Sequence, residues 1–478
     1  MRGGTVVEAT GPRRADVLVG DGRIVAVGPE LTHHGARVIE AGGAFVIPGG
    51  IDVHTHFALP VGAVTSADDF ESGTIAAACG GTTCVVDYAG AGREPWQQAI
   101  ATWHDRARER AVVDYAFHLT VIELPQTVEG AAARFAEFVA RGITSVKLYL
   151  AYPDRLMVDD DTLARALAAS RPTGMRVCAH AEDGAAIEAL TASAIADGRT
   201  GPDAIPSVRP PSVEAAAIRR AAELARDAAA ELYVVHLSSE AGLWAIRAAR
   251  SSGAMVRAET CPHYLHLDAS RLLAGDRDFV CAPPLRAAPD RAALWAALGT
   301  GEVEVVATDH CPFTIEDRRR GTSGTGASTF TQIPGGLSGV ETRLSLVYQG
   351  VRRGHLSLER WVDCTSTAPA RLFGLAGCKG SIRPGLDADL VVFDPSATRR
   401  LDSSELHSRG DRSPYEGVVV TGWPVVTLSR GRVVARDGEP AEAQPGWGRF
   451  IRRSTDSTRP PIPFPAGTRG PTGVEGGT

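Results

Sequence analysis

The chain has no long apolar run. No stretch of about 18 consecutive apolar residues, the length a helix needs to cross a bilayer, occurs in its 478 residues. The N-terminus begins Met1-Arg2-Gly3-Gly4 and passes directly into short polar and apolar alternation, without the pattern of a signal peptide. We therefore expect a protein that neither spans a membrane nor is exported.

Closely spaced cysteine pairs are also missing. The eight cysteines are scattered without CxxC spacing, and several fall in apolar, strand-like runs where reduced, buried thiols are ordinary. A disulfide framework is not expected. This cysteine usage fits a reducing compartment, so we expect a cytoplasmic protein.

The chain also lacks an excess of positive charge. The formal net charge is -6, which gives no electrostatic footprint for binding nucleic acid. Two short basic clusters, residues 318–320 and 449–453, are more typical of solvated surface than of phosphate contacts. We expect a small-molecule partner, and neither nucleic acid nor a membrane.

The hydrophobic content of the chain is high enough for a large core. With 44% hydrophobic residues, 478 residues exceed the usual size of one domain. Residues 1–47 and 375–440 share short β-rich runs separated by glycine turns, and we predict that they form one small β-sandwich domain. Residues 48–374 form the larger domain. Residues 441–478 lack periodicity and are predicted to be a C-terminal tail that could contact a neighbouring subunit.

In the larger domain, strand-like runs alternate with alanine-rich segments whose apolar spacing is near 3.6 residues. Eight such units predict an α/β fold, a TIM-type (β/α)8 barrel with insertions. The expected strands are residues 51–56, 82–87, 115–120, 145–150, 176–181, 232–237, 255–261 and 303–309.

Six polar residues lie near the C-terminal ends of separate runs, where barrels of this type gather their reactive groups. They are His54, His56, Lys147, His180, His236 and Asp309. Strand side chains alternate in direction, so His54 and His56 point the same way and suit one ion. A lone histidine at a strand end is more often structural than a ligand. Four of them with a carboxylate predict a site for two divalent metal ions.

Lys147 is unusual because residues 145–150 otherwise form a buried strand, where an uncompensated ammonium is costly. A salt bridge to Asp309 or Glu182 would relieve the charge. Alternatively, the amine is neutral, captures carbon dioxide and becomes a carbamate, N6-carboxylysine, which can bridge two cations. The residues by themselves leave both interpretations open.

Nine ordered stretches carry a family resemblance. They are PGGIDVHTH (48–56), DFESGT (69–74), SVKLYLAY (145–152), HAE (180–182), VHLSS (235–239), ETCPHYL (259–265), PPLR (283–286), TDHCPF (308–313) and GVETRL (339–344). HxH alone is a weak signal, but the ordered series is strong and spans nearly the whole chain. It resembles the dihydropyrimidinase and D-hydantoinase family, cyclic amidohydrolases of the amidohydrolase superfamily.

The resemblance implies a binuclear metal centre. His54, His56 and Asp309 are implied to hold one ion, and His180 and His236 the other. Zinc is the metal expected first, because imidazole and carboxylate ligands suit it, although manganese or cobalt suits the same set. A homotetramer is also implied.

The mechanism implied is attack by a hydroxide that bridges the two ions together with carboxylated Lys147. The ring of a 5,6-dihydropyrimidine or a 5-substituted hydantoin would open to an N-carbamoyl amino acid. Asp309 would carry the proton from the hydroxide to the leaving nitrogen. Tyr152 would bind the substrate and stabilise the tetrahedral oxyanion, a role that rests on the resemblance.

Five further positions are implied to contact the substrate. The backbone at Ala282 and Gly335 would bind the imide edge of the ring, where relatives more often carry serine and asparagine. Val61, Tyr149 and Leu156 would lie against the exocyclic substituent. Main-chain groups would make the contacts at Ala282 and Gly335. The departures from the family at these two positions therefore concern which ring is preferred and not the reaction.

Alternatives remain within and outside this class. Dihydroorotases usually place an arginine where this chain has Ala58, so dihydroorotate is a poor candidate substrate. An allantoinase-like hydrolase is the runner-up. A non-enzymatic scaffold of the collapsin response mediator type is the alternative of a different class, but those proteins lose the metal ligands that are complete here.

Overall fold

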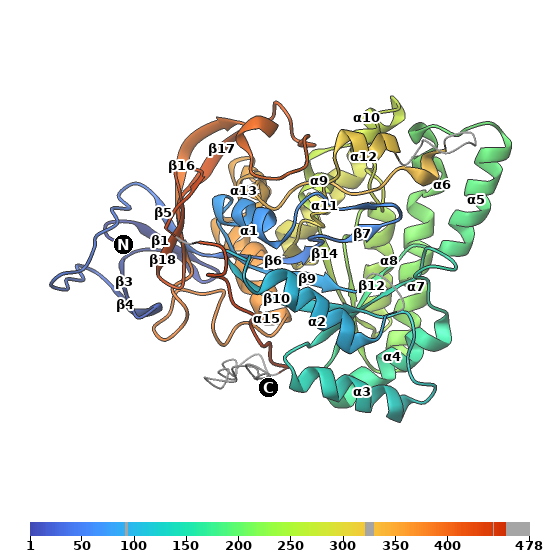
Figure 1. Ribbon diagram of the computed structural model, residues 1–478, viewed down its shortest axis with the longest axis horizontal. Helices are drawn as coiled ribbons and strands as arrows, with labels where there is room; N and C mark the ends of the chain where they lie inside the picture. The colour runs from blue at the N-terminus through green and yellow to red at the C-terminus, as the bar shows by residue number, and fades with distance from the viewer. Residues whose placement is uncertain (91–93, 321–328, 443, 456–478) are drawn as a thin grey trace, which may run out of the picture.

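The computed structural model describes residues 1–90, 94–320, 329–442 and 444–455. Figure 1 shows a barrel enclosed by helices on one side and a separate sheet, which carries the N-terminus, on the other. No described helix is both long and apolar enough to cross a membrane. All eight cysteines are buried and unpaired.

The larger unit is a parallel barrel. Within the described residues its strand order is β15-β14-β13-β12-β11-β10-β9-β6, and a bridge between Thr55 and His310 brings the two edges together. This confirms the predicted (β/α)8 barrel. Its strands are β6 (Gly50–Thr55), β9 (Thr82–Ala89), β10 (Asp114–Thr120), β11 (Ser145–Tyr149), β12 (Arg176–His180), β13 (Glu231–Val234), β14 (Met255–Thr260) and β15 (Val305–Val306).

Amphipathic helices form the outer layer. In α7 (Pro211–Asp227), Val213, Ala217, Ala221 and Ala225 recur at helical spacing and face the barrel. The other long helices are α1 (Phe70–Cys79), α2 (Trp96–Ala107), α3 (Val128–Ala140), α4 (Asp160–Thr173), α5 (Gly184–Ala196), α8 (Glu240–Ser251), α11 (Ala288–Thr300) and α13 (Arg343–Arg352). Shorter helices in the connections are α6 (Ile205–Val208), α9 (Pro262–His266), α10 (Ser270–Leu273), α12 (Ile315–Arg320), α14 (Leu358–Val362) and α15 (Ala368–Leu372).

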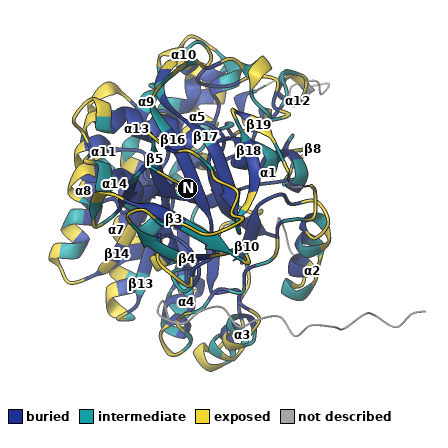
Figure 2. Ribbon diagram, turned by 90° about the vertical axis from the view of Figure 1, so that its left-hand side faces the viewer, coloured by how far each residue is buried: buried dark blue, intermediate teal, exposed yellow. Residues whose placement is uncertain are grey.

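The smaller unit is built from both ends of the chain, as predicted. Its main sheet has the order β19-β18-β17-β16-β5-β1-β2. These strands are β1 (Thr5–Glu8), β2 (Gly11–Arg14), β5 (Phe45–Pro48), β16 (Leu390–Arg400), β17 (Val419–Ser429), β18 (Arg432–Arg436) and β19 (Glu439–Pro440). Buried Val17 and Ile24 of the hairpin β3 (Asp16–Gly20) and β4 (Arg23–Gly28) share one apolar cluster with this sheet, which makes the sandwich (Figure 2). The boundaries at residues 47, 375 and 440 stay predictions.

Two of the arginines predicted to be solvated are buried, and for them that prediction is wrong. Arg318 is 4% exposed and donates to the carbonyl oxygens of Arg277 and Pro334, both at 3.1 Å. Arg453 is 3% exposed and donates to Ser145 Oγ at 2.8 Å. Each guanidinium group thus finds oxygen acceptors inside the protein, although Nε and Nη1 of Arg453 have no hydrogen-bond partner among the described residues. For these two arginines, a basic run did not mark a solvated surface.

The segment after the small sheet runs along the chain's own barrel. Tyr115 N donates to Arg449 O at 3.0 Å, and Ile451 N donates to Tyr115 O at 2.7 Å. Residues 444–455 therefore belong to the barrel's surroundings. The predicted contact with a neighbouring subunit falls partly on residues 456–478, which lie outside the described residues, and stays a prediction.

A buried ionic cluster joins the small sheet to the barrel. Lys379 Nζ donates to Asp114 Oδ2 at 2.8 Å and Asp387 Oδ2 at 3.3 Å, and it also contacts Asp389. Asp114 begins barrel strand β10, whereas Asp387 and Asp389 lie just before β16. One ammonium therefore links the two units through three carboxylates.

Two arginines complete the charge balance of this cluster. Arg430 Nε donates to Asp114 Oδ1 at 3.2 Å, and an Arg449 nitrogen contacts Asp387 Oδ2 at 3.0 Å. Arg23 also approaches Asp387, at 3.9 Å, so with Lys379 every carboxylate of the cluster has a cationic partner. Burial of so much charge is tolerable only because each group is paired.

Replacing Lys379 with methionine should destabilise the protein strongly. The change leaves three buried carboxylates short of one cation, which typically costs about 3–5 kcal/mol of unfolding free energy. Chemical denaturation at neutral pH measures the loss. The matched control is Arg2→Met, which removes the exposed pair with Glu40 and should cost no more than about 1 kcal/mol. Equal stability of the two variants would contradict the role given to the cluster.

Candidate active site

A cavity of about 920 Å³ opens where the barrel strands end. Every residue predicted to bind metal or substrate lines it except His54, which is fully buried behind the wall. The predicted residues in the lining are His56, Val61, Lys147, Tyr149, Tyr152, Leu156, His180, His236, Ala282, Asp309 and Gly335. The barrel therefore brings residues from distant parts of the chain to one face.

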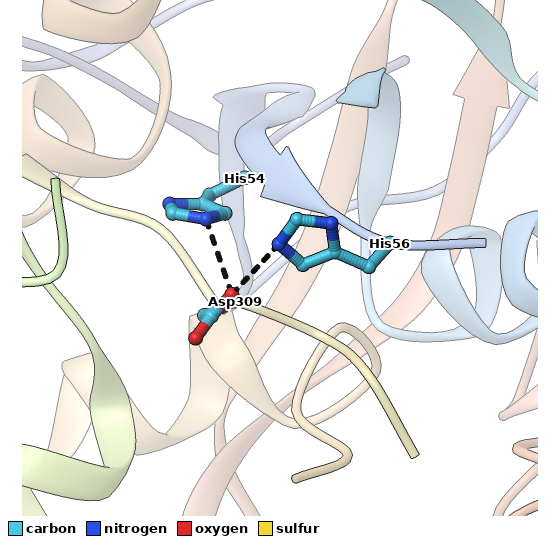
Figure 3. A group of neighbouring side chains, drawn as sticks. All are labelled: His54, His56 and Asp309. Atoms are coloured by element: carbon cyan, nitrogen blue, oxygen red, sulfur yellow. Dashed lines mark ion pairs between the residues drawn. The ribbon is translucent and has the colours of Figure 1, made fainter. Parts of the chain in front are cut away.

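His54, His56 and Asp309 form the first half of the polar centre (Figure 3). Asp309 Oδ1 lies 3.1 Å from His54 Nε2 and 3.0 Å from His56 Nε2. Burial alone would raise the pKa of Asp309, but the two imidazoles beside it hold that pKa well below its usual range. Burial lowers the pKa of His56 to about 4, so its ring is neutral at pH 7. A carboxylate and two imidazole nitrogens thus converge on one point.

A glutamate behind His54 fixes the orientation of its ring. Glu259 contacts His54 Nδ1, and it also accepts from Tyr233 OH at 3.0 Å and His236 N at 3.3 Å. A proton on Nδ1 leaves Nε2 as the lone-pair nitrogen that faces Asp309. This arrangement is the outer-sphere carboxylate that metal-binding histidines usually carry.

His180 and His236 form the second half. His180 Nδ1 lies 2.9 Å from His236 Nε2, and His180 Nε2 lies 2.9 Å from Glu182 Oε2. Burial is the main reason that the pKa of each imidazole falls, and it leaves both rings neutral. Two neutral imidazole nitrogens therefore face each other at the floor of the cavity.

Lys147 lies between the two halves and is 1% exposed. Its Nζ is 2.9 Å from His54 Nε2 and 4.1 Å from the centre of the Tyr88 ring. In the part of the chain that the structure describes, no carboxylate lies within 4.0 Å of this amine, so the salt bridge to Asp309 or Glu182 is not formed. Burial lowers the pKa of Lys147, which favours the neutral amine.

Arg209 connects the second pair of histidines to Tyr152. It forms an ion pair with the fully buried carboxylate of Glu182, and its guanidinium carbon lies 5.1 Å from the centre of the Tyr152 ring. Burial alone would raise the pKa of Glu182, but Arg209 and His180 bring it to about 2. Arg209 thus stabilises the carboxylate of Glu182, which orients His180, and it also packs on Tyr152.

Several residues of the cavity have strained backbones. Tyr152, His236 and Asp309 have φ values of 68°, 40° and 52°, in the left-handed region that side-chain-bearing residues rarely adopt. Strand β15 ends at Val306, earlier than expected, because Thr308 N donates to Asp52 Oδ1 at 3.1 Å and not to a neighbouring strand. The chain is then free to turn Asp309 toward the histidines.

The wall expected to contact the imide edge is braced from behind. Arg318 donates to the carbonyl oxygen of Pro334 and also to that of Gly336, on either side of Gly335. A Cβ at Gly335 would meet Val280 and Cys281 at 3.6 to 3.8 Å, which is ordinary contact. Glycine is therefore not required here by space.

Comparison with known proteins identifies the family. The sequence model of the Amidohydrolase family matches residues 45–434. D-hydantoinase of Geobacillus stearothermophilus is 42% identical over 459 residues, which cover 95% of this chain and 96% of that protein. The crystal structure of dihydropyrimidinase from Brevibacillus agri gives a TM-score of 0.90 at 41% identity, covering 95% and 98% of the two chains. L-hydantoinase (dihydropyrimidinase) from Arthrobacter aurescens gives 0.86 at 30% identity, covering 95% and 99%.

The chain belongs to the D-hydantoinase and dihydropyrimidinase family of amidohydrolases. The donor set of its cavity fits the two metal ions of that family. With Zn–N distances of about 2.0–2.1 Å, two nitrogens of a tetrahedral site lie about 3.3 Å apart. Here the nitrogen–nitrogen separation in one half is 2.9 Å and the two nitrogen–oxygen separations in the other are 3.0 and 3.1 Å, each a few tenths of an ångström shorter.

Sequence reasoning missed the residues that support this amidohydrolase site. Glu259, Arg209 and Tyr88 were not singled out, and neither were Cys281 and Cys311, which line the cavity. Glu259 lies at the end of a barrel strand inside a matching stretch, so its position was a usable signal. Arg209 follows a short helix in a connection, and nothing in its local sequence indicates a role.

Replacing Arg209 with methionine should destabilise the protein most at neutral pH. In the native protein the pKa of Glu182 is about 2, below its ordinary 4.5, so its ionisation contributes stability that is lost as the pH falls toward 2. In the variant, burial raises that pKa, and the unpaired carboxylate should cost about 3–5 kcal/mol at pH 7 and less in mild acid.

Urea unfolding of both proteins at pH 7 and pH 5 measures this difference. The control is Arg141→Met, which removes a surface pair with Glu137 and should cost less than about 1 kcal/mol at either pH. A loss in Arg209→Met that does not depend on pH would contradict the assigned pairing.

Proposed function

We propose that this protein is a binuclear-metal hydrolase that opens cyclic amides, 5,6-dihydropyrimidines and 5-substituted hydantoins, to N-carbamoyl amino acids. The observation that carries the proposal is that His56, His180, His236, Lys147 and Asp309 line one cavity at the strand ends, with His54 directly behind its wall. The names of the relatives, D-hydantoinase and dihydropyrimidinase, support it.

Two cations are proposed to be held in this cavity. The ligands of one are His54, His56 and Asp309, and those of the other are His180 and His236. When bound, the ions supply Lewis acidity, which lowers the pKa of water and polarises the amide carbonyl. Zinc is the metal proposed first, since it suits imidazole and carboxylate donors.

Lys147 is proposed to be carboxylated. Its side chain is 1% exposed, its amine has no carboxylate within 4.0 Å among the described residues, and Nζ lies 2.9 Å from Nε2 of the proposed ligand His54. Bonding of Nζ to carbon dioxide, with loss of a proton, would give a carbamate, so that a carboxylate able to hold cations would replace the amine. A carboxylate, unlike an amine, carries the negative charge that suits a site for cations.

Asp309 is proposed to move the proton. Its side chain is 15% exposed, so one face is buried against His54 and His56 while the other reaches the cavity. Its low pKa makes it a carboxylate at pH 7, able to accept the proton of the attacking water. It can then deliver that proton to the leaving nitrogen as the carbon–nitrogen bond breaks.

Tyr152 is proposed to stabilise the oxyanion. Burial raises its pKa to about 12, so its hydroxyl remains a hydrogen-bond donor at neutral pH. The ring packs against His180 at 5.3 Å between centroids and against the guanidinium of Arg209. A donor held in this way is preorganised for the charge that develops on the carbonyl oxygen.

The walls of the cavity suit a ring with an apolar substituent. Val61, Tyr149 and Leu156 line the cavity beside the polar centre, and the backbone at Ala282 and Gly335 is proposed to bind the imide edge. The similarity to enzymes named D-hydantoinase favours the D enantiomer of 5-substituted hydantoins.

We also propose a cellular compartment and an oligomeric state. The eight unpaired cysteines fit a reducing cytoplasm. A homotetramer is proposed from family membership, and α5 offers an apolar surface for contacts because Leu190 and Ile195 are more than a third exposed.

A substrate panel tests the proposed reaction. Dihydrouracil, hydantoin, the two enantiomers of a 5-phenyl hydantoin, allantoin and dihydroorotate are incubated with protein loaded with zinc, and ring opening is followed by loss of ultraviolet absorbance. Opening of dihydrouracil or a hydantoin, with little or no opening of dihydroorotate, is expected. A protein that binds no divalent metal and opens none of the rings would refute the proposal.

The carboxylated lysine gives a second prediction. Lys147→Ala should lose about 10³-fold or more of kcat, since the two ions are no longer bridged, and short acids such as acetate should restore part of it. Metal content should fall in parallel. Lys147→Arg serves as the control, because it keeps a cation, cannot form a carbamate and fills the space that acetate needs. Full activity of Lys147→Ala without acid would exclude the bridging role.

A further inference from the structure

Besides the active site, the described residues contain two further groups whose side chains could meet on one cation. In the first, Asp114, Asp387 and Asp389, the ammonium of Lys379 already occupies the centre. In the second, Cys79, Glu341 and His407 lie outside the lining of the catalytic cavity. The second group therefore has a different chemistry and no resident ammonium.

These residues meet where the barrel touches the small sheet. Cys79 is the last residue of α1, Glu341 lies just before α13, and His407 lies in the segment between β16 and β17. Helix α1 packs against β18 and β19, and Figure 2 shows the three elements side by side. Glu439, at the start of β19, joins the group from the small sheet.

Glu341 fixes the imidazole of His407. One oxygen accepts from His407 N at 2.8 Å, and the other lies 2.9 Å from Nδ1. A proton on Nδ1 makes Nε2 the lone-pair nitrogen. The same outer-sphere pairing of a carboxylate with Nδ1 orients histidines that bind zinc.

Nε2 of His407 faces two further side chains, and Glu341, followed by Glu439, raises the pKa of this imidazole. His407 Nε2 lies 3.9 Å from Cys79 Sγ and 3.6 Å from Glu439 Oε2. In a tetrahedral zinc site the corresponding ligand separations are about 3.6 Å for nitrogen to sulfur and about 3.4 Å for nitrogen to oxygen. Both separations that involve Nε2 are therefore within a few tenths of an ångström of those on one ion.

The charges around the group favour a cation. Glu341 is buried, and within the described residues neither it nor Glu439 forms an ion pair with a lysine or arginine. Burial, followed by the charges of Glu341 and Glu439, raises the pKa of Cys79. A bound divalent ion would offset both effects, because it attracts the carboxylates and displaces the thiol proton into solvent.

We propose that Cys79, His407 and Glu439 bind a zinc-type divalent ion, with Glu341 orienting His407 and water as the fourth ligand. The site is structural: it attaches β19 of the small sheet to helix α1 of the barrel. Glu439 is 79% exposed on its side chain, so the ion can enter from that side. This inference does not depend on the proposed hydrolase function, because no ligand of the proposed catalytic centre takes part.

Cobalt is the probe that separates the two kinds of site. The purified full-length protein is stripped of metal with a chelator and titrated with Co²⁺. A cobalt ion bound by a thiolate shows a near-ultraviolet charge-transfer band, whereas the proposed catalytic ligands are nitrogen and oxygen donors only. The band should appear in the native chain and be lost in Cys79→Ser.

Two more variants and one control complete the test. His407→Asn keeps a donor for Glu341 but lacks Nε2, and it should also abolish the band. Glu439→Gln changes an exposed side chain, so folding is unaffected, and it should weaken cobalt binding at this site at least about tenfold. Cys364→Ser, which alters another buried thiol, should leave the band intact. Absence of the band in the native chain, or its persistence in Cys79→Ser, would overturn the proposal.

Discussion

The removal of water from the polar groups at the strand ends is the constraint on which this active site depends. His54, Lys147, His180 and His236 are each no more than 2% exposed, so every nitrogen must find a partner inside the protein. Glu259 is such a partner for His54 and Glu182 for His180, and the cavity side of these rings is left to ligands. Burial also lowers the pKa of His56, His180 and His236, which keeps those three rings in the neutral form that can bind a metal ion.

The buried carboxylates that contact the histidines must also have hydrogen-bond or ion-pair partners. Glu259 is satisfied by Tyr233 OH and the backbone of His236, so it costs no additional charge partner. Glu182 is satisfied by Arg209, which in turn packs on Tyr152. The second half of the site therefore includes a positive charge that the first half does not need. This asymmetry follows from which hydrogen-bond donors surround each carboxylate, and it places a guanidinium beside the proposed oxyanion donor.

The sequence was a good guide to the barrel and to the residues at its strand ends, because both follow from local alternation and from one rule of the fold. Lys147 stood out because an isolated ammonium in an apolar strand is physically anomalous. Residues such as Arg209 could not be found in this way, since their partners come from other β/α units and the contact exists only after folding. Arg318 was misjudged for the same reason. Its neighbours in sequence suggest a surface, whereas its partners in space are backbone carbonyls of the cavity wall.

The barrel and the small sheet meet at two polar clusters that differ in how their charge is balanced. Around Lys379, protein cations neutralise every carboxylate, and the cluster is complete without any ligand. Around His407, a thiol and two carboxylates share a single imidazole. A cluster whose carboxylates are all paired with protein cations needs no ion. A cluster with fewer protein cations than carboxylates is the one that a bound cation would stabilise most. The contrast between the two clusters, and not the presence of acidic residues, is the argument for a metal ion beside Cys79.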